Sequence, residues 1–173
     1  RHTHGRFHVQ AEAQLAHDRT KAPLMVTEVK TGTKQDRAPS PFDTTTYIVA
    51  AARLGFSAAN AMRIAEDLYM NGYISYPRTD NTVYPPSLDL NGILQDIRSS
   101  PFKKDVEWTL ANRRAVPTRG KKSTTDHPPI HPAGPATREA IGDDAFRVYE
   151  LVVRRFLATL SPDALWKTMK ILF

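Results

Sequence analysis

The feature that most constrains the fold is an apolar stripe near the C-terminal end of the sequence. Apolar side chains recur there mostly at intervals of three and four residues, the period of one face of an α-helix. The stripe consists of Phe146, Tyr149, Val153, Phe156, Leu157 and Leu160, and Arg147, Arg154 and Arg155 fall mostly outside it. A helix with one apolar face must pack against other elements, and 40% hydrophobic residues can supply a core. The sequence therefore predicts a packed domain that includes this helix.

Further helices are predicted upstream from capping residues and apolar spacing. Glycine or asparagine-glycine follows two of them, as is common after a helix C-terminus. The predicted ranges are Asp43 or a following threonine to Leu54 before Gly55, Ser57 to Asn71-Gly72, Ser87 to Pro101, and a short helix within Phe7–Arg19. The middle of the chain is therefore predicted to be mainly helical.

The two ends of the chain have the composition of strands. Leu24–Val29 follows a proline and is rich in β-branched residues, and Trp166–Phe173 is also strand-like. Lys30–Ser40 has no apolar period and is predicted to be a connector. The expected fold class is mainly α with flanking β-strands, in which a helical domain of residues 41–160 is inserted between 1–40 and 161–173.

Composition limits the class of protein. Without cysteine, the chain has neither disulfides nor thiolate zinc ligands, and an intracellular protein fits best. No run approaches the roughly 20 apolar residues of a membrane span, and no signal peptide is recognisable. We expect a cytoplasmic, nucleoid-associated protein without a membrane partner. The missing initiator methionine and the apolar last residues suggest a piece of a longer polypeptide.

The net charge of +6 favours a polyanionic partner, nucleic acid first. The excess is concentrated between Arg98 and Lys122, where Asp105 and Glu107 are the only acidic residues. The basic residues of this stretch are Arg98, Lys103, Lys104, Arg113, Arg114, Arg119, Lys121 and Lys122. A solvated, mobile loop and a DNA-contacting segment both explain such a run.

The segment GYISYPRTD, residues 72–80, has the clearest chemical content. Pro77 forces Tyr76 out of the α-helical region, and residues two apart in an extended chain project to one face. Tyr76 and Arg78 could therefore face one phosphate together. A guanidinium favours phenolate and neutralises charge on phosphoryl oxygens, and Asp80 could orient it. The alternative is that Tyr76 is a half-buried tyrosine in a turn.

Several motifs resemble the type IA DNA topoisomerases, and they are spread over nearly the whole chain. GYISYPRTDN is similar to the active-site tyrosine motif of that family. The other matching stretches are Pro41-Phe42-Asp43-Thr44-Thr45-Thr46, the Leu54-Gly55-Phe56 to Gly72 spacing, Asp126-His127-Pro128-Pro129-Ile130-His131-Pro132, His4-Gly5-Arg6-Phe7 and Arg154-Arg155-Phe156-Leu157-Ala158. The forms of two motifs most resemble archaeal enzymes and the topoisomerase half of reverse gyrase.

The resemblance implies a role for each matched residue. Tyr76 corresponds to the nucleophile that takes a 5′-phosphate of one DNA strand, and Arg78 to the arginine beside it. His127 corresponds to the active-site histidine, with its role as acid, base or phosphate contact open; a structural hydrogen bond is the alternative. His131 is a weaker candidate. Thr79 and Asp80 are expected to contact the site residues without contacting the DNA themselves. Phosphate contacts are expected from Lys103, Lys104, Arg113, Arg114, Arg119, Lys121 and Lys122.

The resemblance also implies parts that this chain lacks. Family members bind Mg²⁺ through a Toprim domain, which nothing here resembles, and Asp143-Asp144 look like helix-capping residues. We expect no cofactor in this chain, Mg²⁺ in the intact enzyme, and little activity from the chain alone. Residues 1–40 and 161–173 would belong to an arch domain and 41–160 to the tyrosine domain. The expected substrate is a single-stranded segment of negatively supercoiled DNA. Open alternatives are the topoisomerase half of reverse gyrase, a non-catalytic DNA-binding domain of the same fold, and a purely structural helical domain.

Overall fold

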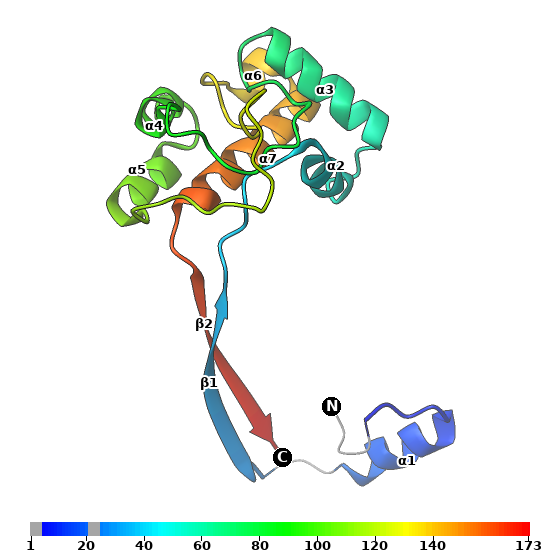
Figure 1. The fold of residues 1–173 in the computed structure, drawn as a ribbon. Helices are drawn as coiled ribbons and strands as arrows, with labels where there is room; N and C mark the ends of the chain where they lie inside the picture. Colours follow the sequence, from blue (N-terminus) through cyan, green and yellow to red (C-terminus); the bar gives the residue numbers. More distant parts are fainter. Residues whose placement is uncertain (1–4, 21–24) are drawn as a thin grey trace. The chain divides into compact units, whose positions relative to one another are not determined.

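The computed structural model describes residues 5–20 and 25–173, and its elements are mostly helices (Figure 1). In chain order they are α1 (Gln10–Arg19), β1 (Glu28–Asp36), α2 (Thr44–Ala52), α3 (Ala58–Met70), α4 (Leu90–Ile97), α5 (Lys103–Asn112), α6 (Arg138–Ile141), α7 (Asp143–Leu160) and β2 (Ala164–Leu172). The predicted class, mainly α with strands near the ends, is confirmed.

The chain divides into two compact units. One contains Asp36–Ala164, and the other contains the described residues up to Gln35 together with Leu165–Phe173. Within the described residues, no helix is long and apolar enough to cross a membrane.

α7 is the centre of the larger unit, as its apolar stripe predicted. α2, α3, α5 and α6 all pack against it, and α4 packs against α5. Figure 1 shows α7 running through the middle of this unit. The fully buried side chains of α7 include Val148, Tyr149, Val152, Val153 and Phe156. Their burial supplies the hydrophobic stabilisation that holds the surrounding helices, and through them the loops, in place.

The predicted starts of α2 and α3 are confirmed, as is the end of α3 before Asn71-Gly72, whereas α2 ends at Ala52, two residues before the predicted Leu54. Asp43 caps α2 in a capping box with Thr46, and Ser57 caps α3. Gly55 and Gly72 follow these helices with φ values of +92° and +77°, a conformation that other residues rarely adopt. Gly72 thereby turns the chain out of α3 and into the tyrosine segment.

Two helix predictions need correction. α4 is capped by Asp89, whose side chain accepts from the amides of Asn91 and Gly92, and not by Ser87. α5 was not predicted, because its sequence is polar and its large Trp108 stays exposed. Only Val106 and Thr109 of α5 are buried, too few to produce a visible apolar stripe. The mobile-loop interpretation of the basic stretch is therefore wrong for Lys103–Asn112.

The first strand lies further along the chain than predicted. β1 and β2 form a two-stranded antiparallel sheet in which the Thr27 amide donates to the Leu172 carbonyl at 2.8 Å. The prediction of Leu24–Val29 holds only for its last two residues, Leu24 itself lies outside the described residues, and Lys30–Ser40 is a strand as far as Asp36. Nearly every side chain of β1 is exposed, so the sequence of this strand carries little apolar pattern. Backbone pairing with β2 fixes the position of β1.

Candidate active site

Three separate segments meet at the site, and each carries one of the motifs singled out in the sequence. The amide of Ile130 donates to the carbonyl of Phe42 at 2.9 Å, and the amide of Ser75 donates to the backbone carbonyl of His131 at 2.9 Å. The amide of Thr44 donates to the Thr79 carbonyl, also at 2.9 Å. Backbone hydrogen bonds therefore join the segments 41–46, 72–81 and 126–132 into one structure.

Tyr76 lies half-buried between two aromatic partners. Its ring packs edge-on against Tyr69 of α3, with 5.2 Å between ring centroids, and against His127 at 4.6 Å with the ring planes 52° apart. Pro77, directly after it, is buried, and residues 75–80 belong to neither a helix nor a strand, with a bend at Pro77. The structure thus brings two of the predicted site residues, Tyr76 and His127, into direct contact.

Arg78 is exposed and is bound by a carboxylate of α3. Its Nε donates to Oε1 of Glu66 at 2.8 Å, and its Nη2 makes a second contact with the same oxygen. Glu66 and Tyr69 are three residues apart on one helix, so they share a face. Tyr76 and Arg78 therefore both contact side chains on the same face of α3, and their joint contact with one phosphate stays a prediction.

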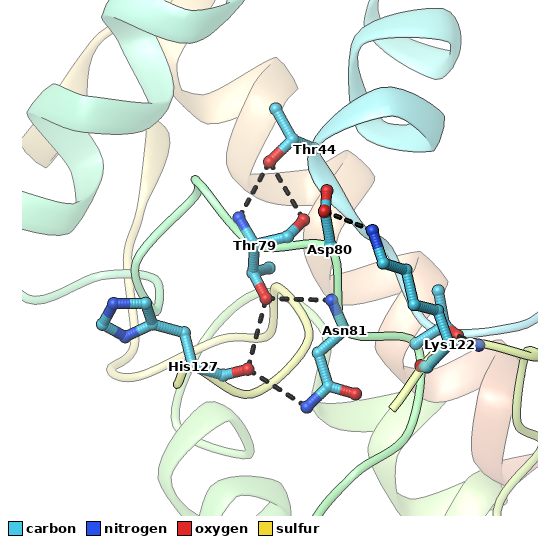
Figure 2. Close-up of polar contacts among 7 residues, drawn as sticks. Thr44, Thr79, Asp80, Asn81, Lys122 and His127 are labelled. Carbon is cyan, nitrogen blue, oxygen red and sulfur yellow. Dashed lines mark hydrogen bonds and ion pairs between the residues drawn. The ribbon is translucent and has the colours of Figure 1, made fainter. Parts of the chain in front are cut away.

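Glu66 was missed by sequence reasoning, and the role assigned to Asp80 is wrong. Asp80 does not orient Arg78; its carboxylate is paired with Lys122 instead (Figure 2). The signal that could have found Glu66 is a carboxylate one helical turn before Tyr69, on the helix that leads into the motif.

Thr44, at the start of α2, holds the segment around Arg78. Its hydroxyl accepts from the Thr79 amide at 2.9 Å and lies 2.7 Å from the Pro77 carbonyl and 3.1 Å from the Thr79 carbonyl, to which it can donate. The backbone on both sides of Arg78 is therefore fixed to α2 by one side chain. The sequence placed this threonine at a helix start and in a stretch that matches the family, but gave it no role at the site.

Thr79 and Asn81 attach the tyrosine segment to the chain around His127. Thr79 is buried, and its hydroxyl donates to the His127 carbonyl at 3.2 Å. Figure 2 shows that Asn81 reaches the same carbonyl from below. Thr79 thus contacts the backbone of His127, and the supporting role expected for it stays a prediction.

A cleft of about 460 Å³ lies beside these residues. It is lined by Thr44, Thr45, Arg78, Thr79, Asp80, Thr124, Asp126 and His127. Its polar lining contains one guanidinium, one imidazole and several hydroxyls, which are groups that bind phosphate oxygens, together with two carboxylates, of which that of Asp80 is paired with Lys122.

The residues of the basic stretch are in different environments. Arg114 is partly buried in an ion pair with Asp163 at 2.8 Å, Lys122 is paired with Asp80, and Arg113 donates to Asn91. The remaining predicted phosphate contacts are Lys103, Lys104, Arg119 and Lys121, all exposed and without an ion pair among the described residues. The freest cations are thus at the start of α5 and on the loop that follows it.

His131 is a structural residue in this arrangement. It is buried, its Nδ1 lies 2.7 Å from the Pro129 carbonyl, and its ring packs against Tyr84. Burial lowers the pKa of His131 below its ordinary value. His127, in contrast, is exposed at the cleft.

No group of three or more histidine and carboxylate side chains in residues 5–20 and 25–173 could hold a metal ion. Asp143 and Asp144 are in the first turn of α7, where they pair with Arg138 and Arg147. The described residues do not fit a magnesium site of their own.

The whole chain, residues 1–173, matches the family model described as DNA topoisomerase. The chain belongs to the type IA DNA topoisomerases. It is 43% identical to DNA topoisomerase 1 of Archaeoglobus fulgidus over 166 residues, which cover 96% of this chain and 25% of that protein. It is 46% identical to DNA topoisomerase 1 of Thermoplasma acidophilum over 127 residues, which cover 73% of this chain and 16% of that protein.

The fold is also found in a solved structure of a topoisomerase I. Full-length topoisomerase I from Thermotoga maritima aligns with 92% of this chain and 26% of its own, with a TM-score of 0.59 and 24% identity. At this identity the similarity supports the topoisomerase fold alone. Since the chain spans a quarter or less of the curated relatives described above, the activity of a whole enzyme has to be argued separately for this protein.

Proposed function

We propose that this chain carries the DNA-cleaving tyrosine of a type IA topoisomerase, and that Tyr76 is that tyrosine. The supporting observation is the juxtaposition of Tyr76 with His127, 4.6 Å between ring centroids, beside an arginine that turns toward the same helix face. The imidazole of His127 and the guanidinium of Arg78 line a polar cleft, and Tyr76 packs against the ring of His127.

The proposed reaction is a reversible transesterification. Tyr76 Oη forms a bond to the phosphorus of one DNA strand, and the bond from phosphorus to the 3′ oxygen breaks. The phenol gives up its proton, and the departing oxygen gains one to become a 3′-hydroxyl. Attack by that hydroxyl reverses the step, so the phosphodiester energy is conserved and religation needs no ATP.

Arg78 and His127 have distinct proposed roles. The Arg78 guanidinium neutralises charge on the phosphoryl oxygens as it builds up in the transition state. His127 lies where it can exchange a proton with the reacting oxygens or donate to the phosphate. Family membership and the ring contact with Tyr76 support involvement of His127 and leave the choice between these roles to experiment.

DNA is proposed to cross the exposed basic side chains near α5 and the following loop. Lys103, Lys104, Arg119 and Lys121 are the most accessible for phosphate contacts. Counterion release makes such binding weaken steeply as salt rises. An affinity for single-stranded DNA that is unchanged between low and high salt would contradict this part of the proposal.

The other components of the enzyme are proposed to lie elsewhere in the polypeptide. We propose a Toprim domain that binds Mg²⁺, an arch domain that includes the β1–β2 ribbon, and relaxation of negatively supercoiled DNA by the assembled protein. The 173-residue chain alone is expected to bind DNA and cleave it poorly. The nucleoid is the expected location.

The test uses the full-length protein and single-stranded DNA labelled at one end or the other, quenched with denaturant after incubation with Mg²⁺. A 5′-phosphotyrosine retains the 3′-end label on the protein and releases the 5′-end label with a 3′-hydroxyl. Tyr76→Phe should abolish the attachment, and Tyr73→Phe is the matched control. Attachment that survives Tyr76→Phe, or none in the wild type, refutes the proposal and favours a DNA-binding domain.

A further inference from the structure

Asn81 is a buried polar residue whose whole side-chain amide is used. Only 2% of the residue is exposed. Its Oδ1 accepts from the Val83 amide at 2.9 Å, and its Nδ2 donates to the Thr124 carbonyl at 2.9 Å. The same Nδ2 donates to the His127 carbonyl at 3.1 Å (Figure 2). Because both N–H groups and the oxygen of this buried amide are hydrogen-bonded, breaking any of these contacts would leave a polar group unpaired. The amide therefore holds its partners in place.

The chain held by Asn81 is the loop that ends at His127. One residue further on, Thr82 pairs with the same loop: its amide donates to the Lys122 carbonyl at 2.9 Å, and its carbonyl accepts from Gly120 at 2.9 Å. Asn81 and Thr79 fix the His127 end, and Thr82 fixes the end near Gly120. Polar bonds from residues 79–82 therefore hold the loop along its length.

The His127 side chain has no such attachment of its own. In the described structure its ring makes no hydrogen bond, and its contact is the ring of Tyr76 at 4.6 Å. Its position relative to Tyr76 consequently depends on its backbone. Two side chains bind the backbone carbonyl of His127, those of Thr79 and Asn81, and only Asn81 also binds Thr124.

We infer that Asn81 is a positioning residue that sets His127 against Tyr76 by holding the carbonyls of residues 124 and 127. This inference rests on the function proposed above, because it matters for activity only if His127 serves the Tyr76 reaction. The chemistry of the position requires two donors and one acceptor on a short planar group. Asparagine supplies these, aspartate has no donor, and serine has one.

The primary variant is Asn81→Asp in the full-length protein. It keeps the shape and the acceptor for Val83 but loses both donations to the loop. Cleavage of single-stranded DNA at saturating concentration should slow by roughly tenfold to a hundredfold, since small displacements of reacting groups cost that much. The added negative charge should weaken DNA binding at low salt by no more than about tenfold, so the cleavage rates are compared at saturating DNA. Asn112→Asp, which removes a donation to the Trp108 carbonyl in α5, is the matched control and should behave as wild type.

The decisive comparison repeats Asn81→Asp in a His127→Ala background. A residue that acts through His127 loses its effect there, so the double variant should cleave about as slowly as His127→Ala alone. Equal fold-losses in both backgrounds would show that Asn81 acts by another route and overturn the inference. So would wild-type cleavage by Asn81→Asp. If Asn81→Asp fails to fold, Asn81→Ser enters the same cycle.

Hydrogen exchange gives a second readout that does not depend on activity. Asn81→Asp should increase exchange in the His127 end of the loop while the Thr82 amide, bound to the Lys122 carbonyl, stays protected. Unchanged protection throughout would also overturn the inference. The proposed function is tested separately by Tyr76→Phe: loss of the covalent adduct in that variant combined with no effect of Asn81→Asp refutes only the role of Asn81.

Discussion

Replacing Thr44 by valine tests how the site is held, because valine keeps the shape of threonine and removes its hydroxyl. In the structure that hydroxyl accepts from the Thr79 amide at 2.9 Å and lies 2.7 Å from the Pro77 carbonyl. Thr79 is only 8% exposed, so water cannot readily replace the lost acceptor. Helix propensity is nearly equal for the two residues, so α2 itself should be little affected.

The expected cost follows from these two contacts. A buried amide left without an acceptor costs about 1–3 kcal/mol, and the lost donation to a carbonyl costs about 1 kcal/mol more. Thr44→Val should therefore lower the free energy of unfolding by about 2–4 kcal/mol. For a chain of this size that corresponds to a fall in Tm on the order of 10 °C.

The matched control is Thr45→Val, one residue along the same helix. Thr45 is exposed, and its hydroxyl makes no hydrogen bond among the described residues, so its replacement should cost less than about 0.5 kcal/mol. Urea unfolding of both variants, followed by circular dichroism, measures the difference. Equal stability of Thr44→Val and Thr45→Val would refute the claim that Thr44 fixes the segment around Arg78.

Three further predictions concern charge, protonation and space. Glu66→Gln keeps an oxygen that can accept from Arg78 and removes a negative charge near the DNA, so single-strand affinity at low salt should rise by about twofold to tenfold; unchanged affinity in an anisotropy titration would contradict this. Because burial lowers the pKa of His131, the unfolded chain binds the proton first, and stability should fall as pH drops below about 6.5. His131→Asn should show a smaller loss of Tm between pH 7 and about pH 5 than wild type, and parallel curves would argue against a buried neutral histidine. Gly120→Ala would place a Cβ 2.4 Å from the Thr82 hydroxyl, so the loop should detach and the Thr82 amide lose its protection from hydrogen exchange, whereas Gly134→Ala, at 3.0 Å from the Gly72 carbonyl, serves as the control outside the loop.

Local signals allowed much of the fold to be predicted. Asp43, Ser57, Gly55 and Gly72 mark helix boundaries because capping and left-handed turns depend on residues close in sequence. β1 could not be placed, because the exposed, polar run Glu28–Asp36 is a strand only through pairing with residues far along the chain. Long-range pairing of this kind leaves no period in the sequence to read.

The same limit applies to the site. Tyr76, Arg78 and His127 were singled out by motif, and the structure brings Tyr76 and His127 together. Thr44 and Asn81 lie in matching motifs but were given no role at the site. Their partners are 35 and 46 residues away and are backbone groups common to every residue. Asp80 was expected to pair with Arg78 because the two residues are close in the sequence. In the structure Arg78 pairs with Glu66 of α3, and Asp80 pairs with Lys122.

The ion pairs also explain why charge alone is a weak guide to DNA contacts. Arg114 and Lys122 count toward the basic stretch, yet each is paired with an aspartate within the fold. The Arg114–Asp163 pair is partly buried and helps to hold its loop in place, whereas the Lys122–Asp80 pair is exposed, and exposed pairs contribute little to stability. Substituting Arg119 or Lys121 should therefore weaken DNA binding with less effect on folding than substituting Arg114.

The most direct test of the central claim is to locate the covalent link on the protein. After denaturant quenching and nuclease digestion, trypsin should release the peptide from Ile64 to Arg78, which contains Tyr69, Tyr73 and Tyr76. Fragmentation in a mass spectrometer then assigns the residual nucleotide to one of the three. We predict that the nucleotide is on Tyr76, joined through its 5′-phosphate. A nucleotide on Tyr69 or Tyr73, or an unmodified peptide from protein that has cleaved DNA, would contradict the account.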